Sequence, residues 1–377
     1  MLRAHGAAYL QSHATAAVQR HALAAIENCR TAALGGHAQV CDACGAMAVH
    51  YNSCHNRHCP KCQALAKERW VAARAAELLP VPYFHLVFTL PHGLNALAQA
   101  NPRVLYAALF RAASQTLLAF GHNVRWLGGE LGATLVLHTW GQNLGQHVHV
   151  HALVAGVALA ADGSIKLARP DFLFPVKALS RVFRAKYLDA LQGAFAHSRL
   201  RFGGSTGALQ TTAAFAAFLA QLRQADWVVY AKRPFAGPRQ VLAYLGRYTH
   251  RVAIGNQRLV SLSDTAVRFR WRDYAHDNAT KVMTLAPAEF IRRFLLHVLP
   301  TGFMRIRHYG WLANRSKRER ISRLRLLLDQ PEPTKPEPES VAAFLSRVCH
   351  LDITRCPQCG AQALRVQIFY PRSRSPP

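Results

Sequence analysis

Three histidines alternate with valines in the segment QHVHVHALVAG, at His147, His149 and His151. Residues two apart in a strand project from the same face, about 6–7 Å from each other, so these imidazoles are predicted to share one face. Two such imidazoles can hold a divalent ion and leave coordination positions open for a substrate. We expect His149 and His151 to be the ligands, with His147, nearer the loop, as a further candidate. The ligand types do not distinguish Mg²⁺, Mn²⁺ and Zn²⁺.

Two tyrosines, Tyr244 and Tyr248, lie four residues apart in AYLGRYTHR, downstream of Pro238, which favours the first turn of a helix. This spacing places both phenols on one helical face. A tyrosine is a competent covalent nucleophile when a metal or a base favours its phenolate. Pairs at this spacing also occur as half-buried core residues, but the histidine strand favours chemistry here. Arg247 and Arg251 of the same helix are candidates for phosphate contacts.

Four cysteines form two C-x-x-C pairs, Cys41 with Cys44 and Cys59 with Cys62. Two such pairs can wrap four thiolates around one Zn²⁺, so these four residues predict one zinc site. Reduced structural cysteines are a weaker alternative, because such residues rarely come paired at this spacing. A redox pair is also weaker, since no βαβ pattern surrounds the motif. Four nearby residues are candidates for a second zinc site, for replacing one ligand, or for supporting the loop: His50, Cys54, His55 and His58.

A third C-x-x-C pair, Cys356 with Cys359, stands near the C-terminus as half of a zinc ribbon. Cys349 and His350 are the nearest residues that could complete it. A metal-free turn, or ligands from elsewhere in the chain, are the alternatives.

The 377 residues carry 46 Lys and Arg against 19 Asp and Glu, a formal net charge of +27. Such a surface favours a polyanionic partner, and nucleic acid is the first candidate. A catalytic site of Asp and Glu is disfavoured because carboxylates are few. Hydrophobic residues make up 51% of the sequence, which excludes a wholly disordered chain. We expect neither a membrane span nor a secretory segment, and nine cysteines then indicate metal ligation in an intracellular protein.

Residue patterns predict strands at 83–90, 134–140 and 147–157, and a β-meander at 258–285. Within the meander, VRFRWRD alternates between an apolar face and a basic one. The basic face is a candidate for DNA binding and consists of Arg268, Arg270 and Arg272. Helices are predicted at 1–36, 63–79, 175–225, 238–250, 288–299 and 315–328.

The chain is expected to divide into five segments. A helical and zinc-binding module at 1–79 precedes a catalytic domain at 80–300 that includes the tyrosine helix. A basic helical segment at 301–328, a Pro-rich linker at 329–340 and a short cysteine-containing tail at 341–377 follow.

Several motifs, in this order, make the chain resemble the rolling-circle HUH transposases of the insertion sequence 91 family, of the two-tyrosine type. They are YNSCHNRHCPKCQ, HLVFTLPH, HTWGQNLGQHVHVHALV, VLAYLGRYTHRVAI, FRWRDYA and FLLHVLPTGFMRIRHYGWLANR. The resemblance covers nearly the whole chain. It implies an α+β fold, with a central antiparallel sheet flanked by helices and preceded by a zinc-ribbon-like module.

The resemblance also implies a bacterial, nucleoid-associated enzyme that nicks single-stranded DNA at element ends and transfers the strand through a 5′-phosphotyrosine. His149 and His151 match the metal pair for Mg²⁺ or Mn²⁺, and Tyr244 and Tyr248 match the two-tyrosine pattern. The third metal ligand stays open among Gln142, His147, His85 and His250, as does the question whether both tyrosines act.

Other functions compatible with the sequence are a zinc-ribbon DNA-binding protein without catalysis and a replication initiator or relaxase with the same chemistry. The first leaves the histidines and tyrosines unexplained. The second shares every feature above, so transposition itself rests on the resemblance. The sequence does not indicate the oligomeric state.

Overall fold

The computed structural model describes residues 1–232, 242, 246, 253–273, 276–332 and 337–371. The chain folds into two compact units. One consists of residues 1–72, 250–298 and 336–377, and the other of residues 73–249 and 299–335. Helix α3 (Ala64–Ala76) contains the first boundary. This division differs from the predicted one, because the meander and the C-terminal tail group with the N-terminal residues.

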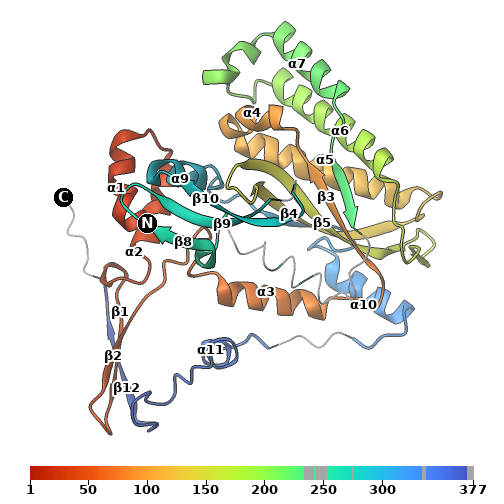
Figure 1. The fold of residues 1–377 in the computed structure, drawn as a ribbon. Helices are drawn as coiled ribbons and strands as arrows, with labels where there is room; N and C mark the ends of the chain where they lie inside the picture. Colours follow the sequence, from red (N-terminus) through yellow and green to blue (C-terminus); the bar gives the residue numbers. More distant parts are fainter. Residues whose placement is uncertain (233–241, 243–245, 247–252, 274–275, 333–336, 372–377) are drawn as a thin grey trace. The chain divides into compact units, whose positions relative to one another are not determined.

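The unit of residues 73–249 and 299–335 is built on an antiparallel sheet with the strand order β11-β4-β5-β3-β7, and β6 pairs with β5 (Figure 1). The three predicted strands are β3, β4 and β5, each within a few residues of its expected bounds. Short strands β6, β7 and β11 were not predicted. The bounds are β3 (Tyr83–Thr89), β4 (Glu130–Trp140), β5 (Gln146–Leu159), β6 (Ile165–Leu167), β7 (Val229–Lys232) and β11 (Ile306–Gly310).

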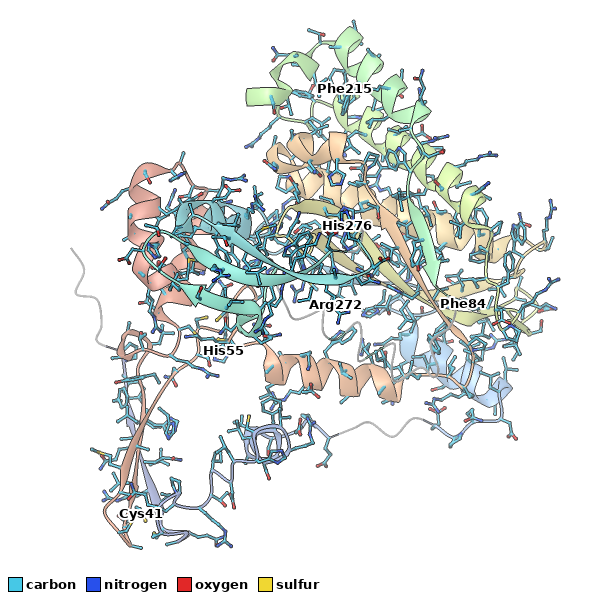
Figure 2. The ribbon with its side chains drawn as sticks, in the orientation of Figure 1. Cys41, His55, Phe84, Phe215, Arg272 and His276 are labelled. Carbon is cyan, nitrogen blue, oxygen red and sulfur yellow. The ribbon has the colours of Figure 1, made fainter. Side chains whose placement is uncertain are left out.

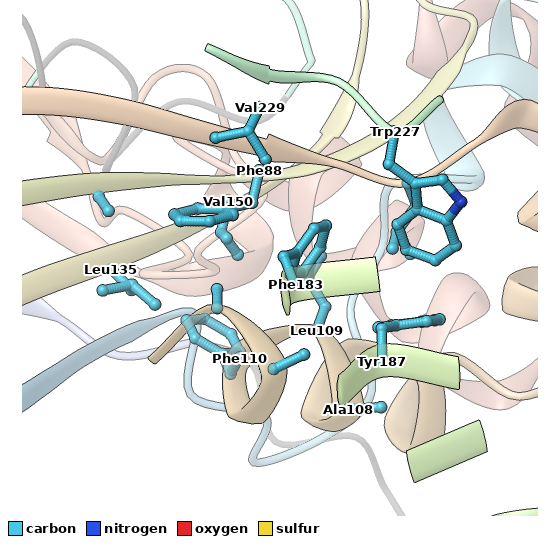
Figure 3. Packing of buried hydrophobic residues seen from close by; sticks show 14 of the residues in the cluster. Phe88, Ala108, Leu109, Phe110, Leu135, Val150, Phe183, Tyr187, Trp227 and Val229 are labelled. Atoms are coloured by element: carbon cyan, nitrogen blue, oxygen red, sulfur yellow. The ribbon is translucent and has the colours of Figure 1, made fainter. Parts of the chain in front are cut away.

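Helices α5 (Pro102–His122) and α6 (Val176–Ala196) cover one face of this sheet (Figure 1). The valines that alternate with the β5 histidines point into this core, where Val150 and Phe88 lie among aromatic residues of the helices (Figure 3). The rings of Phe88 and Phe183 are 5.0 Å apart. Burying such side chains contributes about 1.5–3 kcal/mol each. The same alternation directs the histidines to the opposite face. The other helices are α4 (Asn95–Ala100), α7 (Thr212–Gln224) and α10 (Lys317–Leu327), with short 3₁₀ turns at His92–Leu94 and Gly204–Gln210.

Among the described helices, α5 alone is long and apolar enough to cross a membrane by length and composition. Twelve of its residues are buried against the sheet and α6, which is the packing of a core helix. This feature is weak support for a membrane span.

The unit that contains the N-terminus has a three-stranded meander in the order β10-β9-β8, as predicted for residues 258–285. Phe269 of this sheet packs edge-to-face on Phe290 of α9, with ring centroids 5.7 Å apart. Helix α2 joins α9 through a hydrogen bond in which Gln19 Nε2 donates to the Leu295 carbonyl. The bounds are α1 (Leu2–Ser12), α2 (Ala17–Asn28), β8 (Leu259–Leu262), β9 (Val267–Asp273), β10 (Ala279–Leu285) and α9 (Pro287–Leu295), with 3₁₀ turns at Ala32–Leu34 and Asn256–Arg258.

A second three-stranded sheet in this unit has the order β12-β1-β2 and joins the two ends of the chain (Figure 1). Strand β12 (Leu364–Phe369) pairs antiparallel with β1 (Gly36–Cys41), which pairs with β2 (Met47–Tyr51). Helix α11 (Val341–Cys349) precedes β12. The predicted continuous helix at 1–36 is wrong, because Gly36 already belongs to β1 and two separate helices precede it.

Candidate functional site

Three histidines of the central sheet bring their ring nitrogens together. His138 lies on β4 directly opposite His149 on β5, and His151 is two residues along on the same face. One ligand nitrogen from each of the three lies within 4.8 Å of the others. The Nε2 atoms of His149 and His151 are 3.1 Å apart. Nitrogens bound at about 2.0–2.1 Å to one ion would be separated by about 3.0–3.4 Å, so the pair fits a shared metal.

The remaining nitrogens of His149 and His151 have partners that fix their orientation. His149 Nδ1 lies 2.8 Å from the His147 carbonyl oxygen and donates to it, which leaves Nε2 with its lone pair toward the cluster. His151 Nδ1 lies 2.7 Å from Nε2 of His85 on β3. These contacts correspond to the outer hydrogen bonds that orient histidine ligands in metalloproteins.

Burial keeps the imidazoles of His149 and His151 neutral, the protonation state that binds metal. All three clustered histidines are less than 9% exposed. Burial, followed by the charge of His147, lowers the pKa of His149 to about 3. Burial and the neighbouring His138 lower the pKa of His151 well below its usual value.

The predicted pair His149 and His151 therefore lies together, and the third member of the cluster is His138, which sequence reasoning missed. His138 could be identified only from the register of β4 against β5, which pairs it with His149, and a single sequence does not reveal this register. Two other candidate ligands lie next to the cluster. His85 contacts the outer nitrogen of His151, and the backbone carbonyl of His147 accepts a hydrogen bond from His149. Gln142 stays a candidate ligand, and His250 lies outside the described residues.

The predicted basic stripe is present on β9. Arg268, Arg270 and Arg272 are exposed and alternate with the buried Val267 and Phe269. Figure 2 labels Arg272 on this strand. Within the described part of the chain, no carboxylate pairs with these three guanidinium groups. They are therefore available to an anionic partner.

The tyrosine helix falls almost wholly outside the described residues. Tyr244, Tyr248, Arg247 and Arg251 are among the residues whose structure is not described. Leu242 and Gly246 of this segment are helical and buried.

Comparisons with known proteins identify the family. Residues 132–320, half of the chain, match the family described as "Putative transposase" (Y2_Tnp), and residues 1–90 match the "Transposase zinc-binding domain" of insertion sequence 91 elements. The chain belongs to the insertion sequence 91 family of transposases. Within that family it is 49% identical to the "Putative transposase y4qJ" of Sinorhizobium fredii, over 90% of this chain and 87% of the relative.

A second relative is the transposase for insertion sequence element IS801 of Pseudomonas savastanoi pv. phaseolicola. It is 29% identical over 89% of this chain and 80% of its own length. Among solved structures, the relaxase TrwC bound to a 27-mer DNA covers 44% of this chain and 71% of its own, at 14% identity and a TM-score of 0.24.

The zinc-binding domain of this transposase contains a cluster of four sulfurs from Cys29, Cys54, Cys59 and Cys62. The sulfur of Cys62 lies 3.1 Å from that of Cys29 and 3.6 Å from that of Cys54. Four sulfurs at about 2.3 Å from one Zn²⁺ stand about 3.8 Å apart, whereas a disulfide requires about 2.05 Å. The cluster thus fits a zinc ion, which would stabilise this domain.

The thiols of this cluster influence one another's protonation. Burial raises the pKa of Cys62, but hydrogen bonds with the thiols of Cys29, Cys59 and Cys54 outweigh it and bring the pKa to about 7. Burial raises the pKa of Cys54 to about 11 and also raises the pKa of Cys59. Cys62 therefore ionises near neutral pH, and a bound zinc ion would displace the protons of Cys54 and Cys59.

The predicted single site of Cys41, Cys44, Cys59 and Cys62 is wrong as a ligand set. The two pairs belong to different clusters, because β1 carries Cys41 to the far end of a hairpin (Figure 2). Cys54 does take part in the first cluster. His58 does not belong to either four-sulfur set, and its Nδ1 lies 3.0 Å from Asn56 Oδ1.

The C-terminal pair also has different partners from those expected. Cys356 and Cys359 join Cys41 and Cys44. Neither Cys349 nor His350 belongs to that set, and both are exposed. The structure therefore agrees with the alternative in which ligands from elsewhere in the chain, here Cys41 and Cys44, complete this half-ribbon.

Proposed function

We propose that this transposase nicks single-stranded DNA at the ends of its element and transfers the strand, in rolling-circle-type transposition, through a 5′-phosphotyrosine intermediate on Tyr244 or Tyr248. The observation that supports the proposal is the buried trio of His138, His149 and His151, with ligand nitrogens within 4.8 Å of one another. The neutral imidazoles of His149 and His151, with their outer nitrogens held in place, are arranged for a cation rather than for packing.

A divalent cation such as Mg²⁺ or Mn²⁺, when bound by these histidines, supplies Lewis-acid polarisation of the scissile phosphate. The residues of the chain contribute orientation. The His147 carbonyl and His85 hold the two β5 rings so that little rearrangement is needed when DNA binds.

The covalent step transfers the phosphoryl group from sugar to protein. The phenolic oxygen of one tyrosine forms a bond to phosphorus while the bond between phosphorus and the 3′-oxygen breaks. The proton that the phenol loses ends on the 3′-oxygen, which leaves a free 3′-hydroxyl. Because one phosphoester replaces another, religation needs no nucleotide triphosphate.

The chain length between the sheet and the tyrosines permits this chemistry. Strand β7 ends at Lys232, which pairs with His85 beside the histidine cluster. Tyr244 follows twelve residues later, a segment that can span at most about 40 Å. This length of chain is sufficient for the phenol of Tyr244 to reach the histidine face.

The basic stripe of β9 is proposed to bind DNA through its phosphates, as are Arg247 and Arg251. Such contacts are electrostatic and largely independent of sequence. Recognition of the element ends must then come from other residues. Binding to chromosomal and element DNA would associate the protein with the bacterial nucleoid.

A covalent-adduct assay tests the proposal. Purified protein is incubated with a labelled single-stranded oligonucleotide from the element end and Mn²⁺, and adducts are separated on denaturing gels. We expect an adduct that requires metal, that is lost in His138→Ala, and that persists in His197→Ala, an exposed histidine on the same unit. DNA binding without any adduct would favour the non-catalytic DNA-binding protein.

A replication initiator or relaxase would give the same adduct. The two functions are separated by adding a second oligonucleotide that ends in a 3′-hydroxyl at the opposite element end. Joining of the two element ends supports transposition, whereas nicking that only reseals its own strand supports the initiator or relaxase.

A further inference from the structure

The two ends of the chain carry the same six-residue pattern, C-x-x-C-G-A, as CDACGA at 41–46 and CPQCGA at 356–361. The structure folds both in the same way. The Gly45 amide donates to the Cys41 carbonyl, and the Gly360 amide donates to that of Cys356. Both glycines have positive φ, 72° and 76°, a conformation that glycine adopts without strain. The chain therefore contains two matching cysteine turns.

The sulfurs of these two turns come together at the end of the sheet where β1 closes with Cys41. The sulfur of Cys41 lies 3.6 Å from that of Cys359, and the sulfur of Cys44 lies 3.7 Å from that of Cys356. Both values match the edge of about 3.8 Å expected for four thiolates around one Zn²⁺, and both exclude a disulfide. All four cysteines are free thiols.

The sheet beside these cysteines has little hydrophobic burial to hold it together. Most residues of β2 and β12 are exposed, including Met47, Val49, Val366 and Ile368. A small antiparallel sheet without a packed face is marginal in water. Sheets of this size without a core usually depend on a metal or a disulfide.

We propose that Cys41, Cys44, Cys356 and Cys359 bind a second structural zinc ion, which fastens the C-terminal segment to the N-terminal hairpin as its third strand. The family match to a zinc-binding domain ends at residue 90, so it contains only half of these ligands. The ion closes a loop of more than 300 residues, and a cross-link across a long loop removes the most entropy from the unfolded chain. The inference does not depend on the nicking reaction.

The register of the third strand supports the same assignment. Six residue pairs join β12 to β1, from Gly36 with Phe369 to Cys41 with Leu364. At the cysteine end, the Asp42 amide donates to the Ala363 carbonyl, and the Asp42 carboxylate lies 3.2 Å from the Arg365 guanidinium. The strand is thus registered directly beside the metal ligands.

Zinc content of the full-length protein tests the proposal. The metal is measured by inductively coupled plasma mass spectrometry after exhaustive dialysis against zinc-free buffer. We expect Cys356→Ser/Cys359→Ser to hold one zinc ion fewer per chain than the wild type, and Cys41→Ser/Cys44→Ser to lose the same single ion. The matched control Cys349→Ser, an exposed cysteine outside both clusters, should keep the wild-type content. Loss of two ions, or of none, from either double variant would overturn the proposal.

Hydrogen exchange shows whether the variants remain folded. In both double variants, the amides of β12 should lose their protection while those of β9 in the same unit keep theirs. Protection of β12 that survives removal of the cysteines would mean that no metal is needed to hold the strand, and the proposal would fail.

Discussion

Nε2 of His85 lies 2.7 Å from Nδ1 of His151, and the two rings are stacked with centroids 5.0 Å apart and planes 4° from parallel. His85 comes from β3 and His151 from the neighbouring β5, so the contact joins two strands. It fixes the rotation of the His151 ring with Nε2 toward His149. The orientation of one proposed metal ligand is thus set by a residue that does not belong to the cluster.

Replacing His85 tests whether it acts by positioning. In His85→Ala, His151 can rotate, and we expect Mn²⁺ affinity to fall by about 10–100-fold, the usual loss for an outer hydrogen-bond partner. His85→Gln keeps a hydrogen-bonding group and should recover part of the affinity. Isothermal titration with Mn²⁺ measures both. Equal affinity in wild type and His85→Ala would show that the contact is only packing.

Two glycines, Gly132 and Gly193, form a matched pair for substitution by alanine. A Cβ at Gly132 on β4 would lie 2.6 Å from Cδ2 of the fully buried Trp311, whereas a Cβ at Gly193 on α6 meets no atom within 4 Å. Gly132→Ala should reduce the free energy of unfolding by about 1–3 kcal/mol. Gly193→Ala should increase it by about 0.5–1 kcal/mol, because alanine favours the helix. Urea unfolding measures both, and equal midpoints would contradict the packing at Gly132.

Residue patterns predicted much of the fold. The features that they failed to predict have one physical cause in common, which is that they depend on tertiary structure. The alternation of residue types in β5 and β9 predicted both strands. It also predicted that the histidines share one face of β5 and that the arginines share one face of β9. His138 was missed because its position depends on which strand pairs with β5, and this is a tertiary choice. The edge strands β7 and β11 are too short for a periodic signal.

The cysteine pairing failed for a related reason. Spacing along the chain favoured joining Cys41 and Cys44 to the next pair, Cys59 and Cys62. The actual partners are about 300 residues away or, like Cys29, stand alone in the sequence. Ligand type was predictable from local sequence, but the assignment of ligands to ions required the strand pairing of β1 with β12.

Stability should depend on pH through the buried histidines. Burial lowers the pKa of His149 to about 3 from its usual 6.5, so between these values the unfolded chain binds a proton that the folded chain does not. In buffer without Mg²⁺ or Mn²⁺, the free energy of unfolding should therefore fall as pH decreases below about 6.5. Each such histidine contributes a slope of about 1.4 kcal/mol per pH unit.

Urea unfolding at a series of pH values measures this dependence. His149→Gln removes one titrating group and should flatten the slope relative to the wild type. His197→Gln changes an exposed histidine and should leave it unchanged. Equal slopes in wild type and His149→Gln would contradict the assignment.

The basic stripe on β9 predicts a change in the salt dependence of DNA binding. Each of Arg268→Ser, Arg270→Ser and Arg272→Ser should reduce the slope of log affinity against log salt by about 0.7 for single-stranded DNA, the value for one lost phosphate contact. Fluorescence anisotropy over a series of NaCl concentrations measures the slope. Arg223→Ser, which removes an exposed arginine from α7, should leave it unchanged. An equal effect of all four variants would show that only net charge matters.

The most direct test of the account is to map the tyrosine that carries DNA. The adduct formed with Mn²⁺ is digested with nuclease and trypsin, and the modified peptide is identified by mass spectrometry. We predict a nucleotide attached through its 5′-phosphate to Tyr244 or Tyr248, and we expect this modification to be absent in His138→Ala. The control Tyr230→Phe alters an exposed tyrosine on β7 near the histidines and should leave the modification unchanged. Modification of another residue, or an adduct that survives His138→Ala, would contradict the account.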